Sequence, residues 1–165
     1  MLVVTHLVGF GSRSAGPQIE IFSTMAQSHT GYSSNVQYHA MRFVPTWGGT
    51  VVAAELGGCQ FGGLTWACQV YNEGGGGNPG SGIGTAHSGV AAVTHPSTFS
   101  FTPSATVAAN TAYWIVFNRV SSTDGISVCA PVTGYISGSA ATAGGIASEV
   151  GMAGAELRAS VTINP

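Results

Sequence analysis

Charged side chains are scarce in this sequence. Of its 165 residues 6% are charged, six acidic and four basic, which gives a formal net charge of −2. The basic residues are all arginines and are scattered along the chain, at Arg13, Arg42, Arg119 and Arg158. Binding to nucleic acid requires a cluster of lysines or arginines that neutralises phosphates. We therefore expect no nucleic-acid partner.

The shortage of charge also constrains the surface. A surface that resists association carries charges on about 25–35% of its residues, and ten charged residues fall well short of that level. Either serine, threonine and glycine cover the surface as neutral polar groups, or neighbouring subunits cover much of it. We favour the second interpretation and expect the chain to work within an assembly that includes copies of itself.

Long apolar runs and paired cysteines are missing as well. No stretch approaches the roughly 20 apolar residues of a membrane-spanning helix, so we expect no membrane contact. Met1–Phe10 is apolar but lacks the positive start and the cleavage site of a signal peptide. Three cysteines leave at least one thiol unpaired within the chain. A bridge between Cys59 and Cys68 is geometrically demanding, and we expect these two and Cys129 to be buried thiols made in a reducing cytoplasm.

Motifs for catalysis are also absent. A Ser-His-Asp triad needs a buried acid that orients the base, and the single aspartate, Asp124, precedes a glycine in a turn. The five histidines show none of the spacings that hold zinc, so surface or half-buried imidazoles are expected. The run Gly74–Gly77 lacks the lysine and the helix of a phosphate loop, and Glu73 before it is expected to be a solvated turn carboxylate. The sequence predicts no enzyme, no metal and no cofactor.

Alternation of apolar residues indicates strands. Trp66, Cys68 and Val70 share one face of the segment 64–71, the period of a strand buried on one side. The segment 111–120, which contains Trp114, is apolar on both faces, so it is expected at the centre of a sheet, and both tryptophans are expected in the core. No segment has a helical apolar stripe, and turn signals recur throughout. We predict an all-β fold, an antiparallel β-sandwich of jelly-roll type.

The chain length predicts one domain. Residues 1–35 form either an N-terminal arm or the first strands, residues 36–165 form the sandwich, and the Gly/Ala-rich stretch 138–154 is an extended loop. The glycine run 74–77 lies flat against a neighbour or forms an exposed loop tip. The expected strands are 2–10, 18–24, 36–44, 50–56, 64–71, 83–88, 90–94, 97–102, 111–120, 126–130, 132–136 and 156–163.

Four segments carry a resemblance to a known family. They read AMRFVPTWGGTVVAAELGGC, LTWACQVYNEGGGGNPGSG, STFSFTP and NTAYWIVFNRV. Their order of strands and turns, between Gln37 and Val120, resembles the jelly-roll β-sandwich modules of bacteriophage virion proteins. Such modules also occur in some secreted bacterial surface proteins. The opening LVVTHLVGFGS is similar to the start of some phage virion proteins.

The resemblance implies a non-enzymatic virion structural protein, made in the host cytoplasm. It would decorate or cement a phage capsid, or form part of a head or tail fibre, with the major capsid protein or other virion subunits as partners. Phage decoration proteins are commonly trimers, so the resemblance implies a closed homo-oligomer. Apolar residues of the arm and of the Gly/Ala-rich stretch are the interface candidates: Leu2, Val4, Leu7, Phe10, Ile146 and Met152.

An alternative function stays open. Exposed aromatic rings stack on sugars in carbohydrate-binding sandwiches, so the chain is alternatively a receptor- or carbohydrate-binding module of a phage tail or of a secreted surface protein. Trp47, in the turn that follows Pro45, is the candidate exposed ring, although packing at the edge of the core is its other expected position. A glycan is the partner that this alternative implies.

Overall fold

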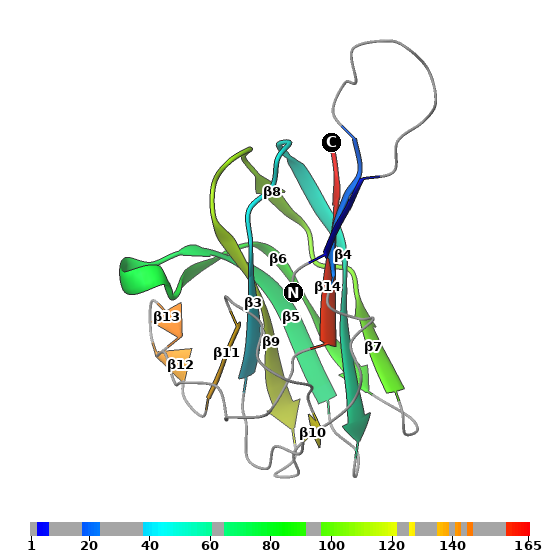
Figure 1. Ribbon diagram of the computed structural model, residues 1–165. Helices are drawn as coiled ribbons and strands as arrows, with labels where there is room; N and C mark the ends of the chain where they lie inside the picture. Colours follow the sequence, from blue (N-terminus) through cyan, green and yellow to red (C-terminus); the bar gives the residue numbers. More distant parts are fainter. Residues whose placement is uncertain are drawn as a thin grey trace.

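The computed structural model describes residues 3–6, 18–23, 38–60, 65–91, 97–121, 126–127, 135–138, 141–142, 145–146 and 158–165. These residues form two antiparallel sheets that pack face to face (Figure 1). Within these ranges the helical structure is confined to the 3-10 turn η1 (Gly75–Gly77). In the described part of the chain no helix is long and apolar enough to cross a membrane. The predicted all-β class and two-sheet architecture are confirmed.

The first sheet, called sheet I, has the order β1-β2-β14-β4. The strands β7 and β8 pair one after the other with the free side of β4, and β10 pairs with the end of β4. The described parts of the segment 1–35 are thus strands of this sheet. The bounds are β1 (Val3–His6), β2 (Glu20–Ser23), β4 (Gly49–Gln60), β7 (Ser97–Phe101), β8 (Ala105–Val107), β10 (Ile126–Ser127) and β14 (Arg158–Asn164).

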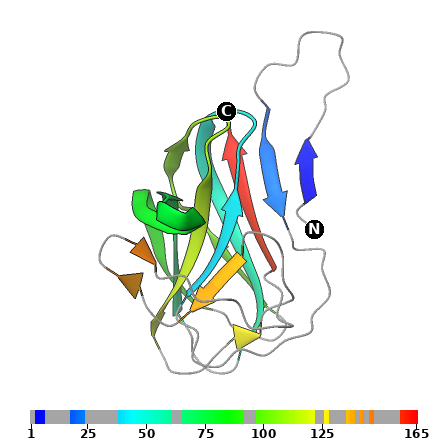
Figure 2. The ribbon, with the colours of Figure 1, turned by 60° about the vertical axis from the view of Figure 1, so that its left-hand side comes forward.

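The second sheet, sheet II, has the order β11-β3-β9-β5-β6 and lies opposite sheet I, as the rotated view in Figure 2 shows. A small two-stranded sheet, β12 (Ala141–Thr142) with β13 (Gly145–Ile146), accompanies it. The strands of sheet II are β3 (Tyr38–Phe43), β5 (Thr65–Glu73), β6 (Pro79–Ala91), β9 (Tyr113–Ser121) and β11 (Tyr135–Gly138).

The strand pairs are nested along the chain. In sheet I, β2 pairs with β14 and β4 pairs with β7 and β8, while in sheet II β3 pairs with β9 and β5 pairs with β6. The innermost pair turns at η1, where Gly76 and Gly77 have φ of 73° and 76° and the Gly74 N–H donates to the Asn78 carbonyl at 2.6 Å. These strand pairs are therefore nested around the hairpin at η1 and alternate between the two sheets.

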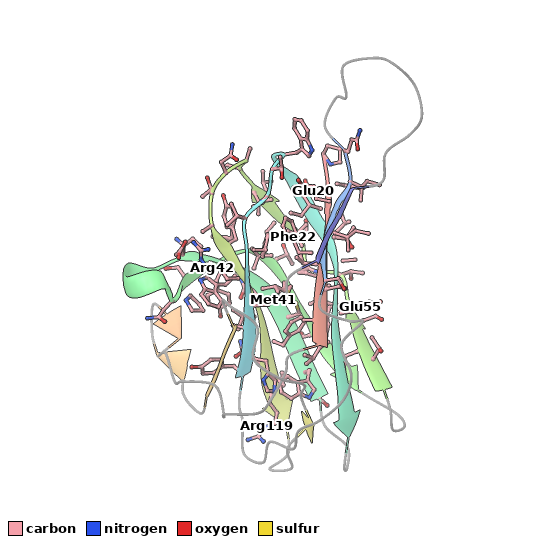
Figure 3. All side chains as sticks on the ribbon, viewed as in Figure 1. Glu20, Phe22, Met41, Arg42, Glu55 and Arg119 are labelled. Atoms are coloured by element: carbon pink, nitrogen blue, oxygen red, sulfur yellow. The ribbon has the colours of Figure 1, made fainter. Side chains whose placement is uncertain are left out.

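The core lies between the sheets and follows the predicted alternation. Trp66, Cys68 and Val70 of β5 are fully buried on its inner face. Figure 3 shows Phe22 and Met41 between the two sheets. The strand β9 is buried on both faces, as predicted, because a second cluster forms on the outer face of sheet II. That cluster consists of Tyr38, Ala40, Trp114 and Val116, with Tyr71 packed against it.

Three strand predictions are wrong. The strand β6 is continuous from Pro79 to Ala91 instead of two short strands, because register shifts at three places let it stay paired with β5 along its length. The strand β4 continues through Gly57 and Gly58, which the sequence analysis placed after its end, because both glycines pair with β7. The strand β8 was not predicted: its three residues are held by pairing with the start of β4.

Candidate functional site

The outer face of sheet I, called the sheet I face, carries little charge in the rows whose side chains the structure describes. Rows of small polar and apolar side chains cross its strands in register. The one ionisable side chain in these rows is Glu55, whose Oε2 accepts a hydrogen bond from the Ser160 hydroxyl at 3.2 Å. The rows are Ser100-Glu55-Ser160-Ser23, Ala53-Thr162-Ile21 and Thr106-Thr50-Asn164.

The strands β7 and β8 form one border of this face, and exposed and buried side chains alternate along them. Every second residue of 98–106 is exposed and is a serine or a threonine, whereas the residues between them are apolar and buried. The strict alternation is visible in the sequence, but the predicted strand ended at Thr102 and did not include β8. The exposed set is Thr98, Ser100, Thr102, Ser104 and Thr106.

Apolar side chains on the sheet I face are exposed where the sheet is irregular. Val52 lies at the bulge where the register of β4 against β14 shifts, and 36% of it is exposed. Ile19, just before β2, is 45% exposed. Small hydroxyl side chains and exposed aliphatic groups cost little to remove from water compared with charges. A protein surface that covers these rows would therefore bury a single ionisable group, Glu55, which keeps its hydrogen bond from Ser160.

One side of the sandwich is closed by backbone contacts between the sheets. The Thr85 N–H donates to the Ser104 carbonyl at 2.6 Å, and the Ser104 N–H donates to the Thr85 carbonyl at 3.0 Å. This contact requires Gly84, whose φ is 64° and where an added Cβ would overlap the Ser104 carbonyl oxygen. The strand β6 thus ties sheet II to the border of the sheet I face.

We expect Gly84→Ala to lower the free energy of unfolding by about 2 kcal/mol or more, because alanine is strained at this φ and its Cβ meets backbone. Gly75→Ala is the matched control: nothing lies within 4 Å of the added Cβ there. The control should stay within roughly 0.5 kcal/mol of the wild type. Urea denaturation measures both variants, and equal midpoints would show that the contact at Gly84 is not needed.

The outer face of sheet II carries an ion pair that the sequence analysis missed. Arg42 Nε and Nη2 donate to the two carboxylate oxygens of Glu73 at 2.9 and 2.8 Å. The hydrogen bonds that Arg42 donates to Glu73 raise the pKa of Arg42. The expectation of a solvated turn carboxylate at Glu73 is wrong, because β3 and β5 both flank β9 and the Arg42 side chain reaches across that strand. Both side chains stay partly exposed.

Planar side chains surround this pair. Arg42 lies opposite Trp114 in the register, and Trp114 lies opposite Tyr71. The side-chain amide of Gln69 lies over Gly82, since a Cβ added there would meet that amide at 2.8 Å. We call Arg42, Gln69, Tyr71 and Glu73 the planar band; all four are partly exposed. Planar polar groups of this kind stack on sugar rings and bind their hydroxyls.

Trp47 is partly buried and lies on the turn between β3 and β4, which joins the two sheets. A buried carboxylate fixes this turn. Glu20 is fully buried in β2 and accepts hydrogen bonds from the Thr46 N–H at 3.0 and 2.9 Å and from the Trp47 N–H at 3.3 Å. Trp47 therefore has a rigid support, but it belongs neither to the sheet I face nor to the planar band.

One histidine prediction is wrong. His39 is fully buried, and its ring stacks on Trp66 with centroids 5.5 Å apart. Burial lowers the pKa of His39 to about 3, so the imidazole is neutral near pH 7. His87 is partly buried, and its Nδ1 accepts a hydrogen bond from the Thr102 N–H at 2.9 Å. Both rings serve the packing of the sandwich.

Cys68 is a free, buried thiol, as expected, and no bridge joins it to Cys59. Burial raises the pKa of this thiol well above its usual value, so it is a poor nucleophile at neutral pH. The residues that the structure describes contain no group of three or more His, Cys, Asp or Glu side chains that would hold a metal ion. Asp124 and Cys129 lie outside the described residues.

The interface candidates of the sequence analysis are placed only in part. Val4 lies in β1, where it pairs with Phe22, and Ile146 lies in β13, where it pairs with Ala141. The other four candidates lie outside the described residues: Leu2, Leu7, Phe10 and Met152. The sheet I face and the planar band are therefore the two candidate binding surfaces among the described residues.

This chain was compared with family models, with curated proteins and with solved structures. No family model, no curated protein and no solved structure matches this chain.

Proposed function

We propose that this protein is a non-enzymatic structural protein of a virion, which decorates or cements a phage capsid or forms part of a head or tail fibre. The observation that carries the proposal is the nested order of the strand pairs. The order β2-β14-β4-β7/β8 facing β3-β9-β5-β6 supports a jelly roll. Viral capsid proteins use this fold repeatedly, because it presents two flat faces on one rigid core.

The sheet I face supports the same function. Its rows carry hydroxyl, amide and aliphatic groups, and its one carboxylate already has a partner in Ser160. A capsid subunit or another copy of the chain that covers these rows buries a single carboxylate, so the desolvation cost is smaller than for a surface with many charges. The major capsid protein, other virion subunits and further copies, in a trimer by resemblance, are the proposed partners, and the virion is the proposed location.

Incorporation into particles tests the proposal. We expect Val52→Arg to reduce incorporation by roughly tenfold, because the substitution places an unpaired charge at the centre of the sheet I face. Val120→Arg is the control, since Val120 is 59% exposed and lies at the end of β9, away from this face. Particles purified by density gradient from cells that produce each variant are measured for bound chain. Normal incorporation of Val52→Arg beside a folded control would refute the role of the sheet I face.

The planar band favours a second candidate function, a receptor- or carbohydrate-binding module. Its partly exposed ring, amide and ion pair are the groups that recognise a neutral sugar, and they lie on β3 and β5, the two strands that flank β9. The jelly roll also occurs in lectins. Binding of the purified chain to neutral oligosaccharides on a glycan array, together with no incorporation into particles, would favour this function over the first.

A further inference from the structure

The strand β1 (Val3–His6) forms an edge of sheet I (Figure 2). It pairs with β2 without a register shift, from Val3 opposite Ser23 to His6 opposite Glu20. Among the described residues no strand pairs with its other side. The outer side of such a strand presents backbone N–H and C=O groups, which form a template for another strand.

This edge lacks the features that protect the edge at β6 and the border at β7 and β8. The strand β6 is irregular, with three register shifts, and it begins at a proline. The border formed by β7 and β8 is interrupted at Pro103. Proteins commonly use bulges, prolines and charges to keep sheet edges from pairing. The sequence of β1, VVTH, contains no proline, glycine, lysine or acid.

The strand β1 is also weakly held within one chain. It has four residues, and β2 is its main neighbour. A short strand that is paired on one side gains few hydrogen bonds against the entropy of ordering it. A second strand on its open side would double its backbone pairing. The strand is therefore more stable in an assembly than in the isolated chain.

We propose that β1 pairs with β1 of a second copy of this chain, antiparallel about a two-fold axis, so that sheet I continues from one subunit into the next. The inference rests on the proposed function as an assembly subunit and names one of its contacts. A two-fold axis makes such an edge complementary to itself, since each unpaired donor meets the acceptor of the same strand in the other copy. The strand carries no fixed charge that would oppose this approach.

The test places like charges across the proposed axis. Sedimentation equilibrium of the full chain should show a monomer–dimer equilibrium. In the double variant Val4→Lys, Thr5→Lys the lysines of the two copies would face each other, and the dissociation constant should rise by roughly tenfold or more. The variant Val4→Glu, Thr5→Glu should lose dimers in the same way. An equal mixture of the two variants should recover a mixed dimer near the wild-type affinity.

A matched variant separates β1 from the other four-residue edge strand. Ile136→Lys, Ser137→Lys places the same charges in β11, at the edge of sheet II, and should leave the dimer intact. Far-UV circular dichroism and thermal unfolding check that every variant folds. A wild-type chain that stays monomeric at all concentrations, or a mixture that does not recover, overturns the proposal. The proposal is also overturned if the β11 variant loses the dimer while the β1 variants keep it.

Incorporation into particles is measured separately, so that the two proposals can fail independently. A chain that dimerises through β1 but enters no particle refutes the virion function and supports the edge pairing. A chain that enters particles as a monomer, with β1 charges that change neither self-association nor incorporation, overturns the edge pairing and supports the virion function.

Discussion

Lowering the pH from 6.5 to 3 is expected to remove roughly 4 kcal/mol of stability through His39 alone. The buried ring has a pKa of about 3, against 6.5 for an exposed histidine. Above pH 6.5 the ring is neutral in both states and its contribution is complete. As the pH falls below 6.5, the unfolded chain binds a proton that the folded chain does not bind until about pH 3. The unfolded state then holds more protons, so stability falls with pH.

The measurement is urea unfolding across this range for the wild type and for His39→Phe. Phenylalanine retains an aromatic ring against Trp66 but does not titrate. Protonation of the carboxylates affects both proteins alike, so the difference between their unfolding free energies isolates the imidazole. The difference should change steadily with pH at about 1.4 kcal/mol per unit. Two parallel curves would mean that the folded and unfolded chains bind the His39 proton over the same pH range, which would contradict the prediction.

Loss of the Glu20 carboxylate is expected to lower the free energy of unfolding by about 3 kcal/mol. The variant Glu20→Ala leaves the N–H groups of Thr46 and Trp47 without the acceptor that holds the turn between the sheets. Hydrogen bonds to charged groups contribute more than neutral ones, and unsatisfied donors near the core cost roughly 1–3 kcal/mol each. A cavity in the core adds to this loss.

Two variants control this prediction. Glu20→Gln keeps one acceptor oxygen and should cost less than the alanine variant. Glu55→Ala removes a partly exposed carboxylate that accepts a hydrogen bond from the Ser160 hydroxyl, and it should change stability by less than about 1 kcal/mol. Chemical denaturation gives the three values, and Trp47 fluorescence reports the turn in the folded state. Equal losses for Glu20→Ala and Glu55→Ala would show that the buried carboxylate does not hold the turn.

The sequence predicted the strands that alternate strictly. β5 and β9 are found close to the expected bounds, β5 with the expected inner face and β9 with the expected burial on both faces, because large apolar side chains alternate along both segments. β8 and the continuous β6 were missed, since short or glycine-rich strands depend on their neighbours for pairing and carry little periodic signal of their own.

The candidate sites were less accessible to prediction. The ion pair of the planar band joins residues 31 positions apart, and only the position of β9 between β3 and β5 brings Arg42 to Glu73. The burial of Glu20 and of His39 likewise depends on which face of a short strand is turned inward. The rows of the sheet I face could be recognised only from the register of five strands, although the alternation of residues 98–107 was visible in the sequence.

The nesting of the strand pairs also affects the order in which the protein folds. The β5–β6 hairpin joins neighbouring segments, so it can form early, but β2 and β4 are connected only through β14, which lies far along the chain from both. Folding rates fall as contacts become more distant in sequence, since chain entropy is lost before those contacts form. Sheet I is therefore completed late. Until β14 pairs with them, β2 and β4 expose unpaired backbone N–H and C=O groups to other chains. For a protein proposed to assemble, the rate at which β14 pairs with β2 and β4 therefore decides between ordered assembly and aggregation.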